Sequence, residues 1–453
     1  MKSVRIGAGA GYAGDRIEPA VDLIEKGELD YIVFECLAER TISIAQKDKL
    51  HDASGGHDSL LLHRMSRVLP SLQARHVRMV SNMGAANPLG AIRKIYELAK
   101  SVGVKNLRIA AVTGDDVSDR LAQFLDLETF ETHAPLKTVG DKIISANAYT
   151  GARKISQALA EGADIVITGR TADPALAVGP VMHEFGRSYD DYDFLGKATA
   201  AGHLLECGSQ VIGGYFADPG YKEVPDLWNI GFPMADFDAD GNVSIRKLQD
   251  AGGVVTQAAV KEQLLYEIHD PGSYLTPDVI ADFSHTSVID GENGTVVVVG
   301  ATGRKKTGLL KVSVGYLNGY IGEGEISYGG SGALARAQLA ADVIRRRFGV
   351  IGLDLEDVRF DFIGVNSLFG NAGGFSQRAR LPKQDCNDVR LRVAGRTSTR
   401  EEARLIEREV EALYTNGPAG GGGARGSVRQ TVSIASVLIP ESEVDEQITY
   451  LDL

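Results

Sequence analysis

Short apolar runs alternate with glycine-rich or polar turns along roughly the first 175 residues, and an amphipathic stretch follows most of the turns. The runs are Val4–Ile6, Leu29–Phe34, His76–Val80, Leu107–Val112, Lys142–Ser145 and Ile165–Thr168. Because these runs are apolar throughout instead of alternating with polar residues, they indicate strands that are buried on both faces of a sheet. Sheets of this kind are parallel and covered by helices, so the pattern predicts an α/β fold.

Polar residues follow the predicted strands, one strand after another. In chain order they are Glu35, Asn82 and Asn87, Asp115 and Asp116, Asn147, and Arg170 with Asp173. In open parallel sheets, ligands bind beyond the carboxyl ends of the strands. We therefore expect Glu35, Asn82, Asp115, Asn147 and Arg170 to gather around one cleft.

The pattern changes after about residue 197. A helix is predicted over Lys197–Val211, and three dipeptides are typical of hairpin turns. These are Asp240-Gly241, Asn293-Gly294 and Asn318-Gly319. Further elements are predicted over Ala333–Phe348 (helix), near Phe360 (strand), and over Val389–Val393 (strand), Arg400–Tyr414 (helix) and Gln430–Leu438 (strand), with a flexible loop over Asn416–Ser427 that includes Gly420–Gly423.

These elements predict two domains. The first, over residues 1–282, is α/β with a mostly parallel sheet, flanking helices and a helical or loop insertion at about 197–282, and it carries the predicted site. The second is a smaller α+β domain over residues 283–453. Segregated hairpins and helices are typical of the α+β class.

Composition and charge restrict the partners of the protein. A chain that is 43% hydrophobic and 24% charged is expected to be globular. Its net charge of −12 disfavours nucleic acid and anionic membrane surfaces as partners, so a small molecule is expected. The three cysteines have no CxxC spacing, and the amino end resembles a strand more than a signal peptide, which favours the cytoplasm. We also expect a homo-oligomer.

The first turn contains a glycine pattern that is found in dinucleotide-binding folds. Gly9, Gly11 and Gly14 match G-x-G-x-x-G after a strand, and Glu35 follows about 20 residues later, where such folds keep a ribose-binding acid. However, Asp15 and Glu18 match a D-x-x-E capping box, whose carboxylate would repel a pyrophosphate. The loop is therefore predicted to bind a dinucleotide, to bind another anion such as a carboxylate or a CoA phosphate, or to be a structural turn. The cofactor is left open.

The strand ends also offer candidates for anion binding and proton transfer. Arg170 presents a fork of donors that matches a carboxylate, unless it pairs with Asp173. Asp115 and Asp116 are candidate bases, although one of them is equally suited to cap the next helix. Three amides, those of Asn82, Asn87 and Asn147, are suited to hold substrate oxygens, and asparagine is also common in ordinary turns.

Two predicted helices add further candidates. His203, Glu206, Cys207 and Gln210 are spaced to share one helix face, which could hold an acid/base pair or, less favourably, a metal. A structural histidine is the alternative. The second helix is predicted over Glu262–Pro271 and brings Tyr266 and His269 to one face, where a solvated surface is the alternative. No metal site is predicted.

Several motifs are absent from the sequence. There is no G-x-x-x-x-G-K-[ST] segment and no G-x-S-x-G segment, which disfavours a P-loop hydrolase and an α/β serine hydrolase. Cys36 follows Glu35 at a strand end, where it is either a nucleophile or a buried apolar residue.

Long collinear segments resemble one known family. They are GAGAGYAGDRIEPAV, DYIVFECLAERT, VSNMGAANP, AAVTGDDV, GADIVITGRTADPALA, GHLLECGSQVIGGYFADPG and KEQLLYEIHDPGSYLTPDV. These segments are similar to those of the acyclic terpene utilisation (AtuA-like) family, over roughly the first 370 residues. The resemblance implies a role in small-molecule catabolism. The family takes its name from a gene cluster that degrades acyclic terpenoid acids through CoA thioesters, and the resemblance does not imply a terpene substrate. It implies no catalytic residue and leaves the reaction open.

Three functions remain compatible with the sequence. The first is an enzyme that acts on an anionic carboxylate or acyl-CoA substrate by hydration, dehydration or carbon–carbon cleavage, as a lyase does. Its residues would be Asp115 or Asp116 as base, His203, Glu206 or His269 as acid or base, Arg170 as clamp, and the three asparagines as oxygen ligands. The second is a dinucleotide-dependent oxidoreductase, and the third is a non-catalytic subunit that binds an acyl-CoA or a protein.

Overall fold

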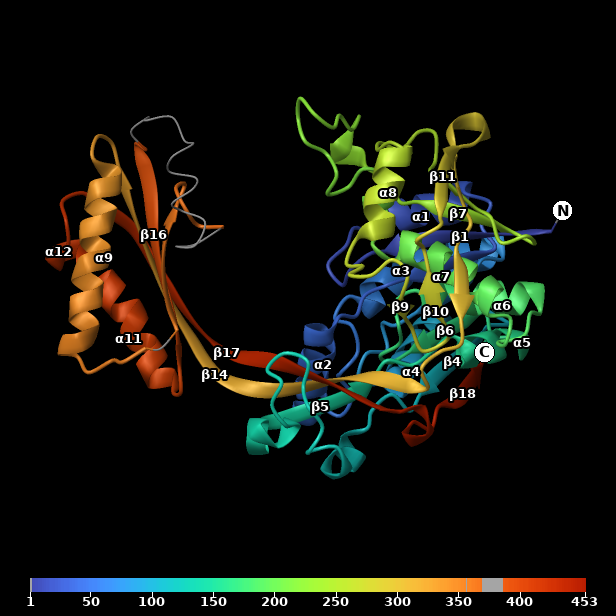
Figure 1. Cartoon of the computed structure of the whole chain (residues 1–453), viewed down its shortest axis with the longest axis horizontal. Coiled ribbons are helices and arrows are strands. Elements are labelled where there is room, and N and C mark those ends of the chain that lie inside the picture. The colour runs from blue at the N-terminus through green and yellow to red at the C-terminus, as the bar shows by residue number, and fades with distance from the viewer. Residues whose placement is uncertain (1, 356, 369–385) are drawn as a thin grey trace. The chain divides into compact units, whose positions relative to one another are not determined.

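The computed structural model describes residues 2–355, 357–368 and 386–453, and its elements are labelled in Figure 1. Internal contacts divide the chain into two compact units. The first unit comprises Met1–Gly315 and Ile434–Leu453, and the second comprises Tyr316–Ser433. The sequence-based boundary at residue 282 lies within the first unit.

The first unit is built on a ten-stranded sheet with the order β11-β12-β8-β7-β1-β2-β3-β6-β4-β18. Its centre is the parallel set β1 (Ser3–Ala10), β2 (Tyr31–Phe34), β3 (Arg78–Ser81), β6 (Ile165–Thr168) and β4 (Arg108–Thr113). Antiparallel strands extend both edges: β7 (Met234–Asp238), β8 (Val243–Arg246), β12 (Val296–Val299) and β11 (Ser287–Asp290) on one side, and β18 (Gln447–Asp452) on the other. The predicted parallel sheet is therefore confirmed at its centre.

Helices cover both faces of this sheet, which explains why its central strands are apolar throughout. One face packs against α1 (Glu18–Lys26), α3 (Leu61–Arg75) and α4 (Pro88–Ser101). The other face packs against α5 (Arg153–Ala160), α6 (Ala175–Phe185) and α7 (Tyr192–Glu206), and α8 (Gln257–Leu265) joins the same core. The strand ends are thereby held rigidly between two apolar layers.

The fifth predicted strand does not join the main sheet. It forms β5 (Ile143–Ala148) and pairs with β14 (Leu309–Gly329), beside α2 (Glu39–His51). Polar positions within it explain the difference, because the Ser145 hydroxyl accepts the backbone N–H of Gly315 and the Asn147 amide donates to Asp115. A three-stranded sheet of β13 (Thr302–Arg304), β10 (Ile280–Asp282) and β9 (Tyr274–Leu275) packs against α7.

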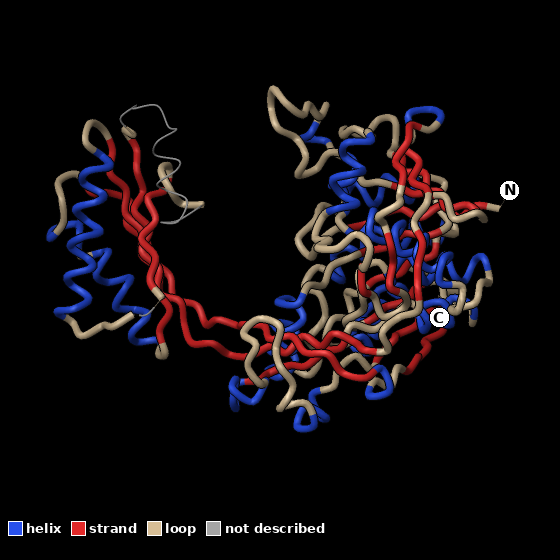
Figure 2. The backbone as a smooth tube through the Cα atoms, viewed as in Figure 1, coloured by secondary structure: helices blue, strands red, loops and turns tan. Residues whose placement is uncertain are grey.

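The second unit is a sheet with helices on one face, as Figure 2 shows. Its strand order is β15-β16-β14-β17, with β15 (Val358–Ile363), β16 (Asp388–Thr397) and β17 (Gly421–Pro440). Its helices are α9 (Ala333–Val350), α11 (Arg400–Glu411) and α12 (Leu413–Asn416). The face opposite the helices carries ion pairs, among them Arg390 with Glu325 at 2.6 Å and Arg392 with Asp361 at 2.9 Å.

The segment about 197–282 also contributes strands to the main sheet, because β7 pairs with β1 and β8 pairs with β7. Three local predictions are wrong. Asn318-Gly319 lies inside β14 and makes no hairpin turn, and the predicted loop Asn416–Ser427 overlaps β17, which begins at Gly421. The helix predicted to end at Pro271 ends at Leu265. The hairpin turns at Asp240-Gly241 and Asn293-Gly294 are confirmed, since they join β7 to β8 and β11 to β12.

Candidate active site

A pocket of about 500 Å³ opens in the first unit beyond the carboxyl ends of β1, β2 and β6. Its wall comes from the turns that follow these strands and from the segments that follow α7 and α8. The lining residues are Gly11, Tyr12, Asp15, Glu35, Leu37, Ala38, Glu39, Tyr149, Asp173, Glu206, Cys207, Ser209, Gln210, Gly214, Tyr215, Tyr266 and Glu267. A pocket at this edge is what a parallel sheet predicts.

Glu35 lies at the end of β2, buried at the wall of the pocket. Its Oε1 accepts the backbone N–H of Leu37 at 2.8 Å and the side-chain amide of Asn82 at 3.0 Å. Burial, followed by the negative charge of Asp173, raises the pKa of Glu35 to about 8. At neutral pH the group therefore holds a proton, which it can give to a ligand.

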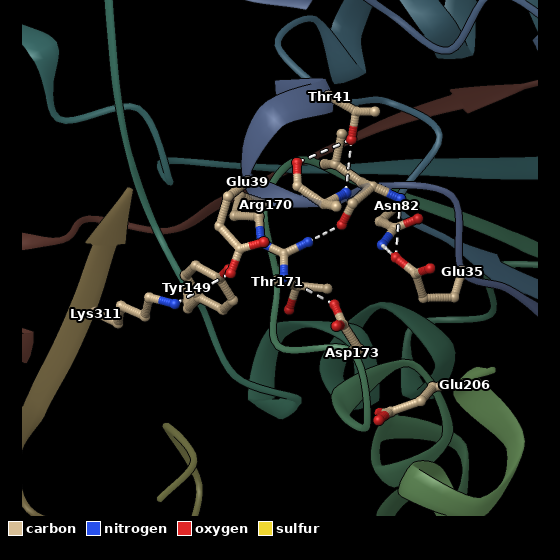
Figure 3. A network of polar contacts seen from close by, with 12 residues as sticks. Glu35, Glu39, Thr41, Asn82, Tyr149, Arg170, Thr171, Asp173, Glu206 and Lys311 are labelled. Carbon is tan, nitrogen blue, oxygen red and sulfur yellow. Dashed lines mark hydrogen bonds and ion pairs between the residues drawn. The ribbon is translucent and has the colours of Figure 1, made fainter. Parts of the chain in front are cut away.

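Arg170 lies behind the pocket wall with its side chain buried. Its guanidinium donates to the carbonyl of Leu37 and, at 2.8 Å, to Asp173, and it stacks on the ring of Tyr149 at 3.9 Å (Figure 3). Nε has no hydrogen-bond partner among the described residues. The pairing with Asp173 that the sequence offered as an alternative is present.

Beside Arg170, Glu39 at the start of α2 accepts hydrogen bonds from the Tyr149 hydroxyl and from Lys311, the latter at 3.1 Å. Burial alone would raise the pKa of Glu39, but the hydrogen bond from Tyr149 and the charges of Lys311 and Arg170 outweigh it and lower the pKa to about 2. Glu39 is therefore a permanent anion, unlike Glu35 on the same wall.

Glu206 ends α7 on another side of the pocket, and His203 supports it from one turn earlier. The Nδ1 atom of His203 lies 2.7 Å from Oε1 of Glu206, so these two residues share a helix face as predicted. The helix predicted over Lys197–Val211 ends at Glu206, so Cys207 and Gln210 lie beyond it. Burial raises the pKa of Glu206 to about 7, although the charge of His203 opposes the rise. His203 packs on Phe283, with ring centres 6.1 Å apart, and Oε2 of Glu206 has no hydrogen-bond partner in the described part of the chain.

Asp115 and Asn147 form a buried layer that supports Arg170 from outside the pocket lining. Asp115 accepts the backbone N–H of Arg170 at 2.9 Å and the amide of Asn147 at 2.8 Å. Burial raises the pKa of Asp115 to about 6 against these two hydrogen bonds. The neighbouring Asp116 accepts from Gln46 at 2.8 Å and from the backbone N–H of Ser118.

The carboxylate of Asp15 occupies the backbone N–H groups of the glycine loop. Asp15 accepts the backbone N–H groups of Gly11 and Arg16, each at 2.9 Å. The predicted capping box is absent, because α1 has Ile17 at its N-cap and no side-chain cap. The three glycines serve close packing, since a Cβ atom would lie 2.6 Å from the Phe34 ring at Gly9, 2.4 Å from the Cys207 backbone at Gly11 and 2.7 Å from the Tyr12 ring at Gly14.

The structure brings most of the predicted residues into one connected group. Glu35 and Asn82 are bonded to each other, Asp115 and Asn147 support Arg170, and Arg170 contacts Leu37 in the pocket wall. Of these, Glu35 alone lines the pocket.

Three further candidates lie apart from the pocket. Asn87 caps α4 by accepting from Gly90 and donates to the carbonyl of Gly55 at 2.8 Å. His269 is exposed and lies beyond the end of α8. Cys36 is buried against Arg64 at 3.3 Å, and burial outweighs the positive charge of Arg64 and raises the pKa of the thiol well above its usual value, which disfavours a nucleophile.

Sequence reasoning missed several lining residues. Glu39 and Tyr149 form a hydrogen bond although more than 100 residues separate them in the sequence, and no local sequence pattern predicts this contact. Glu267 was missed as well, and it reaches the pocket together with the predicted candidate Tyr266 because α8 ends one residue earlier and Glu267 adopts a positive φ of 59°. Within the described ranges, no three His, Cys, Asp or Glu side chains are grouped as a metal ion requires.

The fold and the pocket define an α/β protein with an acidic pocket at the strand ends. The chain belongs to the acyclic terpene utilisation family, because the model of acyclic terpene utilisation family protein AtuA matches residues 4–450. Membership confirms the resemblance found in the sequence and associates the chain with acyclic terpene utilisation, a catabolic process. No curated protein and no solved structure matches the chain. None of the helices in the described ranges has the length and apolarity of a transmembrane span.

Proposed function

We propose that the protein is an acid–base enzyme of small-molecule catabolism that adds water to, or removes water from, an acyl thioester. The observation that carries the proposal is the pair Glu35 and Glu206 on the wall of one pocket. The pKa of Glu35 is raised to about 8 and that of Glu206 to about 7, so the two groups hold and accept protons near neutral pH.

In the proposed reaction, Glu35 is the general acid and Glu206 is the general base. In dehydration, the protonated Glu35 gives its proton to the departing hydroxyl, the carbon–oxygen bond breaks and water leaves. Glu206 takes the proton from the carbon next to the thioester carbonyl, and the electrons of that carbon–hydrogen bond form the double bond. Hydration is the reverse, and its balance needs no oxidant or reductant. Retro-aldol cleavage of a carbon–carbon bond needs a similar acid and base and is the nearest related reaction.

The pocket favours a thioester over a free carboxylate. Arg170, the predicted clamp, already donates to Leu37 and Asp173, and the lining adds Glu39, an anion. A free carboxylate in the pocket would therefore meet repulsion without a free guanidinium to offset it. The acyl part of a thioester is uncharged and avoids this cost.

The same geometry disfavours the other two functions. A dinucleotide pyrophosphate would need the backbone N–H of Gly11, which Asp15 already occupies. A purely binding subunit has no need of carboxyl groups with strongly raised pKa values on its pocket wall, and this pocket has two.

The test measures the addition of water to thioesters and its removal from them. Wild-type protein is incubated in D2O with 2-enoyl-CoA and 3-hydroxyacyl-CoA thioesters of several chain shapes, and mass spectrometry follows the gain or loss of water and of deuterium. Glu35→Gln and Glu206→Gln are expected to slow the reaction by roughly 100-fold or more. Glu25→Gln on the exposed side of α1 is the matched control and should react at the wild-type rate. Wild-type rates in both pocket variants, or no reaction with any thioester, would contradict the proposal.

A further inference from the structure

The wall of the pocket is rich in hydrogen-bond acceptors. Six acidic residues line it: Asp15, Glu35, Glu39, Asp173, Glu206 and Glu267. No lysine, arginine or histidine is among the lining residues of the described chain. A ligand therefore meets mostly oxygen atoms that accept hydrogen bonds, and it must supply donors of its own.

The positive charges that balance this wall lie behind it. Glu39 is paired with Lys311 at 3.1 Å, Asp173 with Arg170 at 2.8 Å, and Glu206 with His203 at 2.7 Å. A cationic ligand would compete with partners that are already in place, so it gains less than the number of carboxylates suggests. An anionic ligand would face the acceptors directly and be repelled.

One acceptor has no hydrogen-bond partner in the described part of the chain. Oε2 of Glu206 is buried without a partner, although the side chain lines the pocket and is 10% exposed. A buried carboxylate oxygen without a partner is costly, and a donor from the ligand would remove that cost.

The remaining wall suits carbon–hydrogen surfaces of a polar molecule better than a hydrocarbon chain. Four tyrosines line the pocket, Tyr12, Tyr149, Tyr215 and Tyr266, and of these Tyr12 and Tyr215 are 61% and 89% exposed. The aliphatic lining is limited to Leu37 and Ala38. A branched hydrocarbon would bury most of its surface against polar atoms, which gives little hydrophobic gain.

We propose that the pocket takes a short, uncharged group with two or more hydroxyls, which donate to Glu206, Glu267 and neighbouring acceptors. This inference rests on the proposed function in one respect: the hydroxylated group is the part of the acyl chain that loses or gains water. It specifies a hydroxylated acyl group and excludes a plain branched hydrocarbon chain as the preferred occupant.

The experiment measures binding without turnover. Ligand-detected NMR on the full-length chain compares xylitol, 1,5-diaminopentane and pentanoate, which are matched in carbon number. Xylitol is expected to bind roughly tenfold more tightly than the other two compounds, because it alone offers hydrogen-bond donors and carries no charge. Glu206→Gln and, separately, Glu267→Gln should each weaken xylitol binding by roughly five- to tenfold, which is the loss of a charge-assisted hydrogen bond.

The matched control is Glu25→Gln, which should bind xylitol as the wild type does. Tighter binding of the diamine or of pentanoate, no xylitol binding, or unchanged binding in both pocket variants would overturn the inference. Its failure is separable from that of the proposed function. Water addition to thioesters without xylitol binding contradicts the ligand class alone, whereas xylitol binding with full activity in Glu35→Gln contradicts the acid–base mechanism alone.

Discussion

Replacing Glu35 by Gln is expected to stabilise the first compact unit while it removes the proposed acid. The folded protein holds the pKa of this carboxyl group at about 8, whereas its ordinary value is 4.5. Gln keeps an oxygen that accepts from Leu37 and Asn82, so the two hydrogen bonds observed for Oε1 persist. The substitution therefore removes the ionisable group with little change in shape.

The sign and size of the effect follow from proton linkage. Below about pH 4.5 both the folded and the unfolded states are protonated, and Glu35 costs nothing. As the pH rises toward 8, the unfolded state loses its proton while the folded state keeps it, so the wild type loses about 1.4 kcal/mol of stability per pH unit. At pH 7 the accumulated cost is about 3 kcal/mol, and above pH 8 it is constant. Gln at position 35 removes this cost in stability.

Urea unfolding between about pH 5 and 8 measures the effect. Trp228, the single tryptophan of the chain, is 77% exposed and therefore changes its surroundings little on unfolding. Hydrogen exchange read by mass spectrometry on peptides of the first unit instead reports on the unit that contains Glu35. The difference in unfolding free energy between Glu35→Gln and wild type should grow with pH in favour of the variant, and Glu25→Gln should show no such growth. A variant that is less stable than the wild type, or a difference that is independent of pH, would refute the raised pKa. Loss of activity with gained stability would also exclude misfolding as the cause of inactivity.

Three other substitutions test the supports of the site. Asp115→Asn keeps an oxygen that accepts both N–H groups and removes a carboxyl group whose pKa burial raises to about 6, so by the same proton linkage it should stabilise the first unit by about 3 kcal/mol at pH 7 in urea unfolding, with no change expected if Asp115 were solvated. His203→Ala leaves Glu206 buried without its partner, so it should lower the unfolding free energy by roughly 3–5 kcal/mol. It should also raise the pKa of Glu206 and shift the pH profile of activity upward, and an unshifted profile would show that His203 does not control this pKa. Gly196→Ala places a Cβ atom 2.0 Å from the Thr302 carbonyl and should cost about 1–3 kcal/mol, whereas Gly349→Ala, which meets nothing within 4 Å, should not destabilise the protein.

The sequence predicts the centre of the fold because apolar runs report burial on two faces. Val4–Ile6 and Ile165–Thr168 are surrounded by helices, and both fall in the parallel set. The run that became β5 misleads because its apolar positions alternate with Ser145 and Asn147, whose partners lie far along the chain. Edge strands such as β18 are half exposed and carry a weaker pattern.

The candidate site was predictable where it depends on strand ends or on the spacing of residues along one helix. Glu35 is correctly placed by its position after β2, and Glu206 by its spacing from His203 on one helix. The anion clamp was harder to judge, because sequence cannot show that the guanidinium of Arg170 is already used by Leu37 and Asp173. The same limit applies to Tyr149 and Glu39, whose contact depends on the crossing of distant segments.

The path of the chain through β14 and β17 also has a consequence for biosynthesis. β18, residues 447–452, pairs with β4 along its whole length, and the ribosome makes it only after residues 316–433, so the main sheet receives this strand last. While the ribosome is still translating the second unit, the outer edge of β4 has no neighbour and exposes its backbone hydrogen-bonding groups. A nascent chain of this protein therefore passes through a stage in which it is open to strand addition by other chains, and removal of its last few residues would make that stage permanent.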